Sequence, residues 1–127
     1  AAAVDAAAAE DGSESGSDID YEEEAFELGP HTLRVLTAGT LPLEVLLRLQ
    51  EAQEEISGRR VWCGSLSLAA LLLAEPALVE RRVVVELGAG SGVVGMLALA
   101  QGARAAVLTD RDDATTLRLL RGNLALN

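Results

Sequence analysis

Short apolar segments separated by glycine turns dominate the second half of the chain. Residues 83–87 (VVVEL) are β-branched and almost wholly apolar, which is typical of a strand buried on both faces in a parallel sheet. Residues 105–109 (AAVLT) predict a second such strand, and residues 92–100 between them are apolar on all sides, which predicts a buried helix. The order strand, glycine turn, helix, strand predicts a βαβ unit with a right-handed crossover, and hence an α/β fold with a parallel sheet.

Weaker periodic patterns surround this unit. Residues 32–36 alternate polar and apolar positions, which predicts a short strand. Helical spacing predicts one helix over residues 42–56 and another over residues 66–74. A last helix follows, and Asp112 or Asp113 can cap its start. The apolar face of that helix comprises Ala114, Leu117, Leu120 and Leu124.

Charge divides the chain into two parts. Of 20 acidic and 10 basic residues, ten acids and no base fall in residues 1–27, which accounts for the whole net charge of -10. Small polar residues and charge of one sign bury too little apolar area to offset chain entropy. We therefore expect residues 1–28 to be a disordered acidic tail and residues 29–127 to fold. An interaction or phosphorylation role of the tail stays open, through Ser13, Ser15 and Ser17.

The composition argues against several classes of protein. The basic residues, all arginine, form no cluster of the kind that binds nucleic acid, and no apolar run of eighteen residues predicts a membrane span. The single histidine, His31, has no metal-ligand partners nearby, so we expect no metal site. The single cysteine, Cys63, suits a reducing compartment, which predicts a cytoplasmic or nuclear protein, and we interpret its side chain as a small packed hydrophobe.

The candidate chemistry lies in the glycine turn over residues 86–95 (ELGAGSGVVG). The turn joins a strand end to a helix start, where backbone N–H groups lack partners. Gly88 and Gly90 allow a ligand to approach the backbone, and Gly95 allows close packing of helix on strand. Because ligands of doubly wound sheets bind outside the carboxyl ends of strands, the turn predicts a binding site. A structural turn without a ligand is the alternative.

Asp110 ends the next strand, twenty-two residues after Gly88. Adjacent parallel strands bring their carboxyl ends together, so we expect Asp110 beside the glycine turn; its alternative role is to cap the last helix. A carboxylate at that place can accept hydrogen bonds from both hydroxyls of a ribose. The pair of features therefore predicts a nucleoside-containing cofactor.

The class of cofactor depends on the register of the glycines. Residues 90–95 formally match the dinucleotide fingerprint G-x-G-x-x-G with an acid twenty residues on, so an NAD-dependent oxidoreductase stays open. The glycine series begins earlier, however, at Gly88 directly after the strand. Glu86 would repel a pyrophosphate but tolerate the ammonium and sulfonium groups of S-adenosylmethionine, which favours that cofactor. Pairing of Glu86 with Arg81 or Arg111 is the alternative role for its carboxylate.

A set of motifs in this order resembles one known family. Residues 83–95 are similar to motif I of seven-β-strand S-adenosylmethionine-dependent methyltransferases. Over about residues 30–127 the chain resembles the lysine methyltransferase-like group, methyltransferase family 16. The motifs that carry this wider resemblance are residues 31–35, Val61-Trp62, residues 66–73, residues 85–92, residues 108–111, Asn123 and Asn127.

The resemblance implies a Rossmann-like domain of the class I methyltransferase type, of which the chain holds the first two core strands, and lysine side chains of proteins as substrates. It implies these cofactor-binding residues: Trp62, Glu86, Gly88, Ala89, Gly90 and Asp110. Residues 88–90 would wrap the methionine part and Asp110 would hold the ribose. Trp62, which alone would be interpreted as a core residue, is expected near the cofactor, and Glu86 is expected to act directly or through water. No catalytic residue is implied.

The sequence departs from the family in three places. The link over residues 39–57 is longer than usual, and Cys63-Gly64 stands where the group often has an acid or proline followed by a small residue. The later strands of the family have no counterpart in the sequence, which also begins without methionine. We therefore expect a fragment of a methyltransferase that is inactive alone. A non-catalytic fragment or regulatory module that keeps the outline of the cofactor site is the alternative.

Overall fold

The computed structural model describes residues 19–51 and 56–127, which form a mixed α/β fold. Its strands are β1 (Tyr21–Leu28), β2 (His31–Ala38), β3 (Val83–Leu87) and β4 (Ala105–Thr109). Its α-helices are α1 (Leu43–Glu51), α2 (Cys63–Ala74), α3 (Val93–Ala100) and α4 (Ala114–Leu126), and short 3-10 helices lie at Ser57–Arg59 and Pro76–Leu78. None of the helices in these two ranges has the length and apolarity needed to cross a membrane.

The predicted βαβ unit is present, and its two strands have the predicted bounds. β3 pairs in parallel with β4, from Val83 opposite Ala105 to Leu87 opposite Thr109. Helix α3 joins the two strands, and its residues 93–98 are all buried, as a helix that is apolar on every side requires. The prediction of an α/β fold with a parallel sheet is therefore confirmed.

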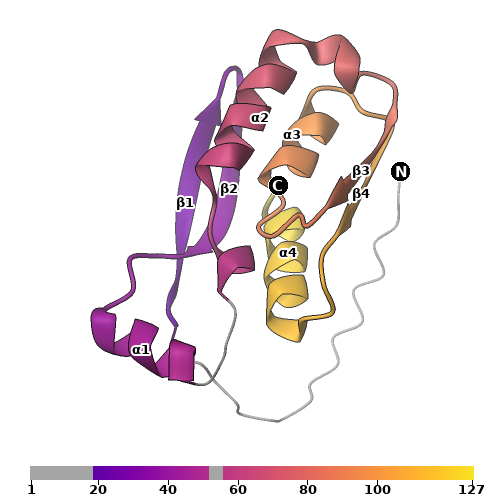
Figure 1. Cartoon of the computed structure of the whole chain (residues 1–127). Coiled ribbons are helices and arrows are strands. Elements are labelled where there is room, and N and C mark those ends of the chain that lie inside the picture. The colour runs from indigo at the N-terminus through magenta and orange to yellow at the C-terminus, as the bar shows by residue number, and fades with distance from the viewer. Residues whose placement is uncertain (1–18, 52–55) are drawn as a thin grey trace.

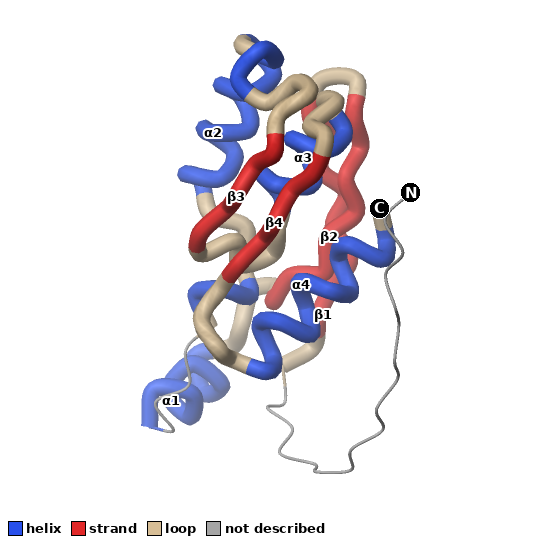
Figure 2. The backbone as a smooth tube through the Cα atoms, turned by 90° about the vertical axis from the view of Figure 1, so that its right-hand side faces the viewer, coloured by secondary structure: helices blue, strands red, loops and turns tan. Residues whose placement is uncertain are grey.

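Helix α3 lies in the middle of the molecule, between two separate sheets (Figures 1 and 2). The parallel β3–β4 sheet lies on one side of it, and the antiparallel β1–β2 sheet lies on the other. Helix α2 packs beside α3, and α4 packs against β2. The main core forms where these layers meet and comprises Leu28, Leu33, Val35, Ala69, Leu72, Val79, Val93, Val94, Met96, Leu97 and Ala98.

The acidic segment before Gly29 is a strand, not a tail. β1 pairs with β2 in antiparallel fashion, from Tyr21 opposite Ala38 to Leu28 opposite His31. The expectation of disorder is therefore wrong for residues 21–28, while residues 1–18 lie outside the described part of the chain. The predicted strand over residues 32–36 is confirmed and is longer, because the hairpin extends it at both ends.

The charge pattern wrongly predicted disorder for residues 21–28 because acidic side chains of β1 bond across the hairpin. The partners are Glu23 with Arg34 at 2.7 Å, Glu24 with the Thr37 hydroxyl at 2.9 Å, and Glu27 with the Thr32 hydroxyl at 2.9 Å. Glu24 shares its face of the strand with Phe26, which packs against the core, and with Leu28, which is buried. Cross-strand pairs of this kind stabilise a sheet even where its sequence is rich in charge.

Within the part of the chain that the structure describes, one face of the parallel β3–β4 sheet is exposed. Val85 of β3 is 60% exposed and Leu87 is 82% exposed, and Val107 on β4 is 51% exposed. These side chains point away from α3, whereas Val84 points toward the core. The prediction that both faces of the strands are buried is therefore wrong for this face within residues 19–51 and 56–127.

Candidate cofactor-binding site

The turn after β3 has the backbone that its glycines permit. Gly88, Gly90 and Gly92 have positive φ angles of 67°, 52° and 83°, which residues with side chains rarely adopt. Two backbone hydrogen bonds hold the turn: the Ala89 N–H donates to the Thr109 carbonyl at 2.9 Å, and the Gly92 N–H donates to the Ala89 carbonyl at 2.8 Å. The turn is therefore fixed both internally and to the end of β4.

Asp110 lies against this turn, as the parallel pairing predicts. Its Oδ2 accepts a hydrogen bond from the Gly90 N–H at 2.6 Å, and its Oδ1 accepts one from the Arg111 N–H at 2.8 Å. A carboxylate has about four lone-pair positions, so both oxygens keep capacity for a ligand. The two features from which the nucleoside site was predicted are therefore in direct contact.

Asp113, rather than Asp110, caps α4. Its Oδ2 accepts a hydrogen bond from the Thr116 N–H at 2.9 Å and a second, short one from the Thr116 hydroxyl. The hydroxyl bond is the main cause that lowers the pKa of Asp113 below its usual range, with smaller contributions from backbone N–H groups and from the positive charge of Arg59. Because the cap is occupied by Asp113, the alternative role for Asp110 is wrong.

A cavity of about 220 Å³ opens beside the turn. It is lined by Ser57, Gly58, Arg60, Trp62, Ser65, Gly88, Ala89, Gly90, Ser91, Asp110, Arg111 and Thr116. Five of the six residues expected to bind the cofactor therefore meet in one cavity, and Glu86 is the exception. Sequence reasoning missed the loop over residues 57–60, because no local signal shows that this loop folds against the glycine turn.

Trp62 is placed at the mouth of the cavity by the start of α2. Its carbonyl accepts the Ser65 N–H at 3.0 Å, which begins the helix, and its indole Nε1 donates to the Ser57 carbonyl at 2.7 Å. The side chain is 57% exposed, so the alternative of a core residue is wrong for Trp62. Its neighbour Cys63 is also exposed, so the interpretation of that side chain as a packed hydrophobe is wrong as well.

The glycines leave room where a ligand would need it. A Cβ added at Gly88 would meet no atom within 4 Å, so the backbone there borders open space. A Cβ added at Gly90 would lie 3.2 Å from the Gly58 carbonyl oxygen, which is closer than most real contacts. Gly90 therefore allows the loop at residue 58 to close over the turn, and Gly88 keeps the wall of the cavity free of side chains.

Glu86 lies behind the turn and supports helix α3. Its Oε2 accepts a hydrogen bond from the Gly95 N–H at 2.8 Å, and a Cβ at Gly95 would lie 2.6 Å from the same oxygen. The side chain lines a second cavity, of about 430 Å³, between α2 and β3. Burial is the main cause that raises the pKa of Glu86 above its usual range; the Gly95 hydrogen bond opposes this, and the nearby charge of Asp110 adds to it.

Comparison with known proteins gives the family. The family model described as lysine methyltransferase matches residues 42–127, which is more than half of the chain, so the chain belongs to the lysine methyltransferase family. Two curated relatives are each called "Protein N-terminal and lysine N-methyltransferase EFM7" and come from Cryptococcus neoformans var. neoformans serotype D, strains B-3501A and JEC21. Each is 33% identical over 70 residues, which cover 55% of this chain but 23% of the relative.

Proposed function

We propose that this chain is the N-terminal part of an S-adenosylmethionine-dependent protein methyltransferase that acts on lysine side chains. The observation that carries the proposal is the contact between the Gly90 N–H and the Asp110 carboxylate inside the cavity that Trp62 borders. Family membership over residues 42–127 supports the same reaction class. The β3–α3–β4 unit then corresponds to the first part of a Rossmann-like methyltransferase sheet.

The residues around the cavity fit the parts of S-adenosylmethionine. Residues 88–90 present backbone without side chains, which suits the methionine part, and the free lone pairs of Asp110 suit the ribose hydroxyls. Trp62 offers an exposed aromatic face beside them. Glu86 lies outside this cavity, so we assign it an indirect role through helix α3 and the local negative charge.

The size of the cavity suggests that these residues form part of a larger pocket. Its volume of about 220 Å³ is below the roughly 300–1,000 Å³ that is typical of ligand pockets. The 70 residues that match the curated relatives also represent 23% of the length of those proteins. We therefore propose that residues outside this chain complete the adenine side of the pocket and supply the groove for the substrate.

The reaction needs little covalent chemistry from the protein. S-adenosylmethionine supplies a methyl group on a positively charged sulfur; the lone pair of a neutral amine forms the new N–C bond while the S–C electron pair returns to sulfur. The protein must hold the two reactants in line and leave the amine without its extra proton. The curated relatives are called both N-terminal and lysine methyltransferases, and both acceptors are primary amines, so an N-terminal amine is the second candidate acceptor.

Thermal denaturation of the full-length protein tests the cofactor, and labelled methyl transfer tests the reaction. S-adenosylhomocysteine should raise the melting temperature, whereas NAD should not. Incubation of cell proteins with methyl-labelled S-adenosylmethionine should then put label on lysine side chains, as located by mass spectrometry. Stabilisation by NAD alone would favour the oxidoreductase alternative, and cofactor binding without transfer would favour the non-catalytic module.

A further inference from the structure

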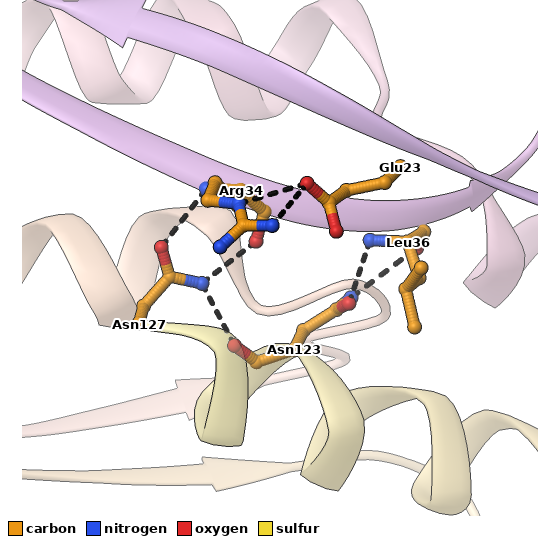
Figure 3. Close-up of polar contacts among 5 residues, drawn as sticks. All are labelled: Glu23, Arg34, Leu36, Asn123 and Asn127. Atoms are coloured by element: carbon orange, nitrogen blue, oxygen red, sulfur yellow. Dashed lines mark hydrogen bonds and ion pairs between the residues drawn. The ribbon is translucent and has the colours of Figure 1, made fainter.

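Helix α4 is joined to β2 by the side-chain amides of Asn123 and Asn127 (Figure 3). The Asn123 Oδ1 accepts the Leu36 N–H at 2.7 Å, and its Nδ2 donates to the Leu36 carbonyl at 3.3 Å. The Asn127 amide bonds Arg34 in the same way, accepting its N–H at 2.9 Å and donating to its carbonyl at 2.7 Å. The two amides therefore bond this edge of β2 in the manner of a neighbouring strand.

The spacing of these residues explains how a helix can match a strand. Four residues of a helix rise by about 6 Å, and two residues of a strand rise by about 6.6 Å. Asn123 and Asn127 are four apart, and their partners Arg34 and Leu36 are two apart. Successive amides on one face of α4 thus meet successive outward-facing peptide groups of β2. The N–H and C=O groups of Arg34 and Leu36 on this edge are thus satisfied without a third strand.

The two asparagines differ in what else they bind. The second N–H of Asn127 donates to the Asn123 carbonyl of the same helix at 2.8 Å. The second N–H of Asn123 donates instead to the Ser91 carbonyl at 3.0 Å, within the glycine turn. Asn123 is fully buried, with 0% exposed surface, and its two donors and its acceptor are all used. Asn123 therefore bonds both β2 and the turn that borders the candidate cofactor site.

The Ser91–Gly92 peptide is held in its direction by hydrogen bonds to both of its polar groups. Gly92 has a φ of 83°, and glycine adopts positive and negative φ about equally well, so the backbone preference of Gly92 does not by itself fix this direction. Its N–H bonds the Ala89 carbonyl at 2.8 Å, and its carbonyl bonds Asn123. Leu120 of α4 also packs beneath the turn, 2.5 Å from the place of a Cβ on Gly92.

We propose that Asn123 is a positioning residue for the cofactor-binding turn. By fixing the Ser91 carbonyl, its amide holds the neighbouring Gly90 N–H toward Asp110, and it links the turn to β2. These bonds connect the β1–β2 hairpin to the turn by way of α4. The hairpin thereby influences the affinity of the site. This inference rests on the proposed function because that function supplies the ligand. The hydrogen bonds from which it is argued do not depend on that function.

Calorimetric titration of the full-length protein with S-adenosylhomocysteine tests the proposal. Loss of a buried hydrogen-bond donor weakens an interaction that depends on it by about tenfold, so Asn123→Ala should raise the Kd about tenfold while the binding stoichiometry stays unchanged. Asn127→Ala is the matched control: it removes the equivalent bonds to β2 and should lower the melting temperature while the Kd stays unchanged. If the role of Asn123 were purely structural, Asn123→Ala would instead lower the binding stoichiometry and leave the Kd unchanged. That result would overturn the proposal.

Hydrogen exchange of the ligand-free protein gives a second test, which needs no cofactor. The amides of residues 88–92 should exchange faster in Asn123→Ala than in Asn127→Ala or in the unsubstituted protein. If Asn123→Ala does not fold, Asn123→Ser, which keeps a short hydroxyl, replaces it in both measurements. Equal exchange of the turn in the two asparagine variants would contradict the inference. If the unsubstituted protein does not bind S-adenosylhomocysteine, the proposed function is contradicted instead. The hydrogen-exchange measurement then decides the role of Asn123.

Discussion

The Gly90 N–H donates a hydrogen bond of 2.6 Å to Oδ2 of Asp110, although the two residues are 20 positions apart. The bond exists because β3 and β4 are adjacent and parallel, so that the turn after one strand lies beside the residue after the other. It gives the carboxylate two roles: it shapes the turn, and it presents its remaining lone pairs to the cavity. The glycine turn and the acid thus act as one site.

Replacement of Gly90 by alanine should distort the site. The residue has a positive φ of 52°, and a Cβ would lie 3.2 Å from the Gly58 carbonyl oxygen, so we expect a loss of about 1 kcal/mol or more in the free energy of unfolding. Binding of S-adenosylhomocysteine should weaken as well. Denaturant unfolding and calorimetric titration measure the two effects.

Gly64→Ala is the matched control for that substitution. Gly64 lies in the first turn of α2, and a Cβ there would meet nothing within 4 Å. Alanine favours a helix over glycine by up to about 1 kcal/mol, so this variant should be as stable as the unsubstituted protein or more so. Equal tolerance of alanine at positions 64 and 90 would contradict the proposed close approach of the turn and the loop.

The burial of Glu86 predicts a pH-dependent difference in stability. Burial raises the pKa of this carboxyl above its usual range, so the folded protein binds the proton more tightly than the unfolded chain does. The resulting stabilisation is present in acid, below the unfolded pKa, and is lost as pH rises through the folded pKa. Glu86→Gln removes the charge and keeps an acceptor for the Gly95 N–H.

The free energy of unfolding of Glu86→Gln, relative to the unsubstituted protein, should therefore rise from acidic to neutral pH. Urea denaturation at several pH values measures this difference. Glu44→Gln, at an exposed position of α1, serves as the control for the general effect of removing a negative charge. A relative stability of Glu86→Gln that falls with rising pH would show that the carboxylate stabilises the fold instead.

The exposed face of the parallel sheet predicts self-association of residues 1–127 when they are produced alone. Val85 and Val107 lie on this face, and exposed apolar strands promote aggregation. Val85→Thr together with Val107→Thr keeps the preference for a strand and should reduce light scattering at equal concentration. Val84→Thr, on the face toward the core, should not reduce the scattering and should lower stability.

Turnover by residues 1–127 alone would contradict our expectation that this part is inactive.

The sequence predicted best the elements whose signal is local and apolar. The bounds of β3 and β4 follow from two short apolar segments, and the contact of Asp110 with the turn follows from parallel pairing. The strand β1 was missed because its acids bond to partners on β2 that the charge count does not reveal. Tertiary packing alone brings Asn123 to Ser91, 32 residues away; the sequence marked Asn123 as part of a family motif but gave it no role.

The most direct test of the account is the affinity of S-adenosylhomocysteine for Asp110→Asn and Asp112→Asn, measured by calorimetric titration. Hydrogen bonds to a charged group contribute about 1.5–3 kcal/mol, so Asp110→Asn should raise the Kd by about tenfold or more. Asp112 is exposed, two residues away, and its substitution should leave the Kd unchanged. An unchanged Kd in Asp110→Asn would contradict the proposal that this carboxylate and the glycine turn bind the cofactor together.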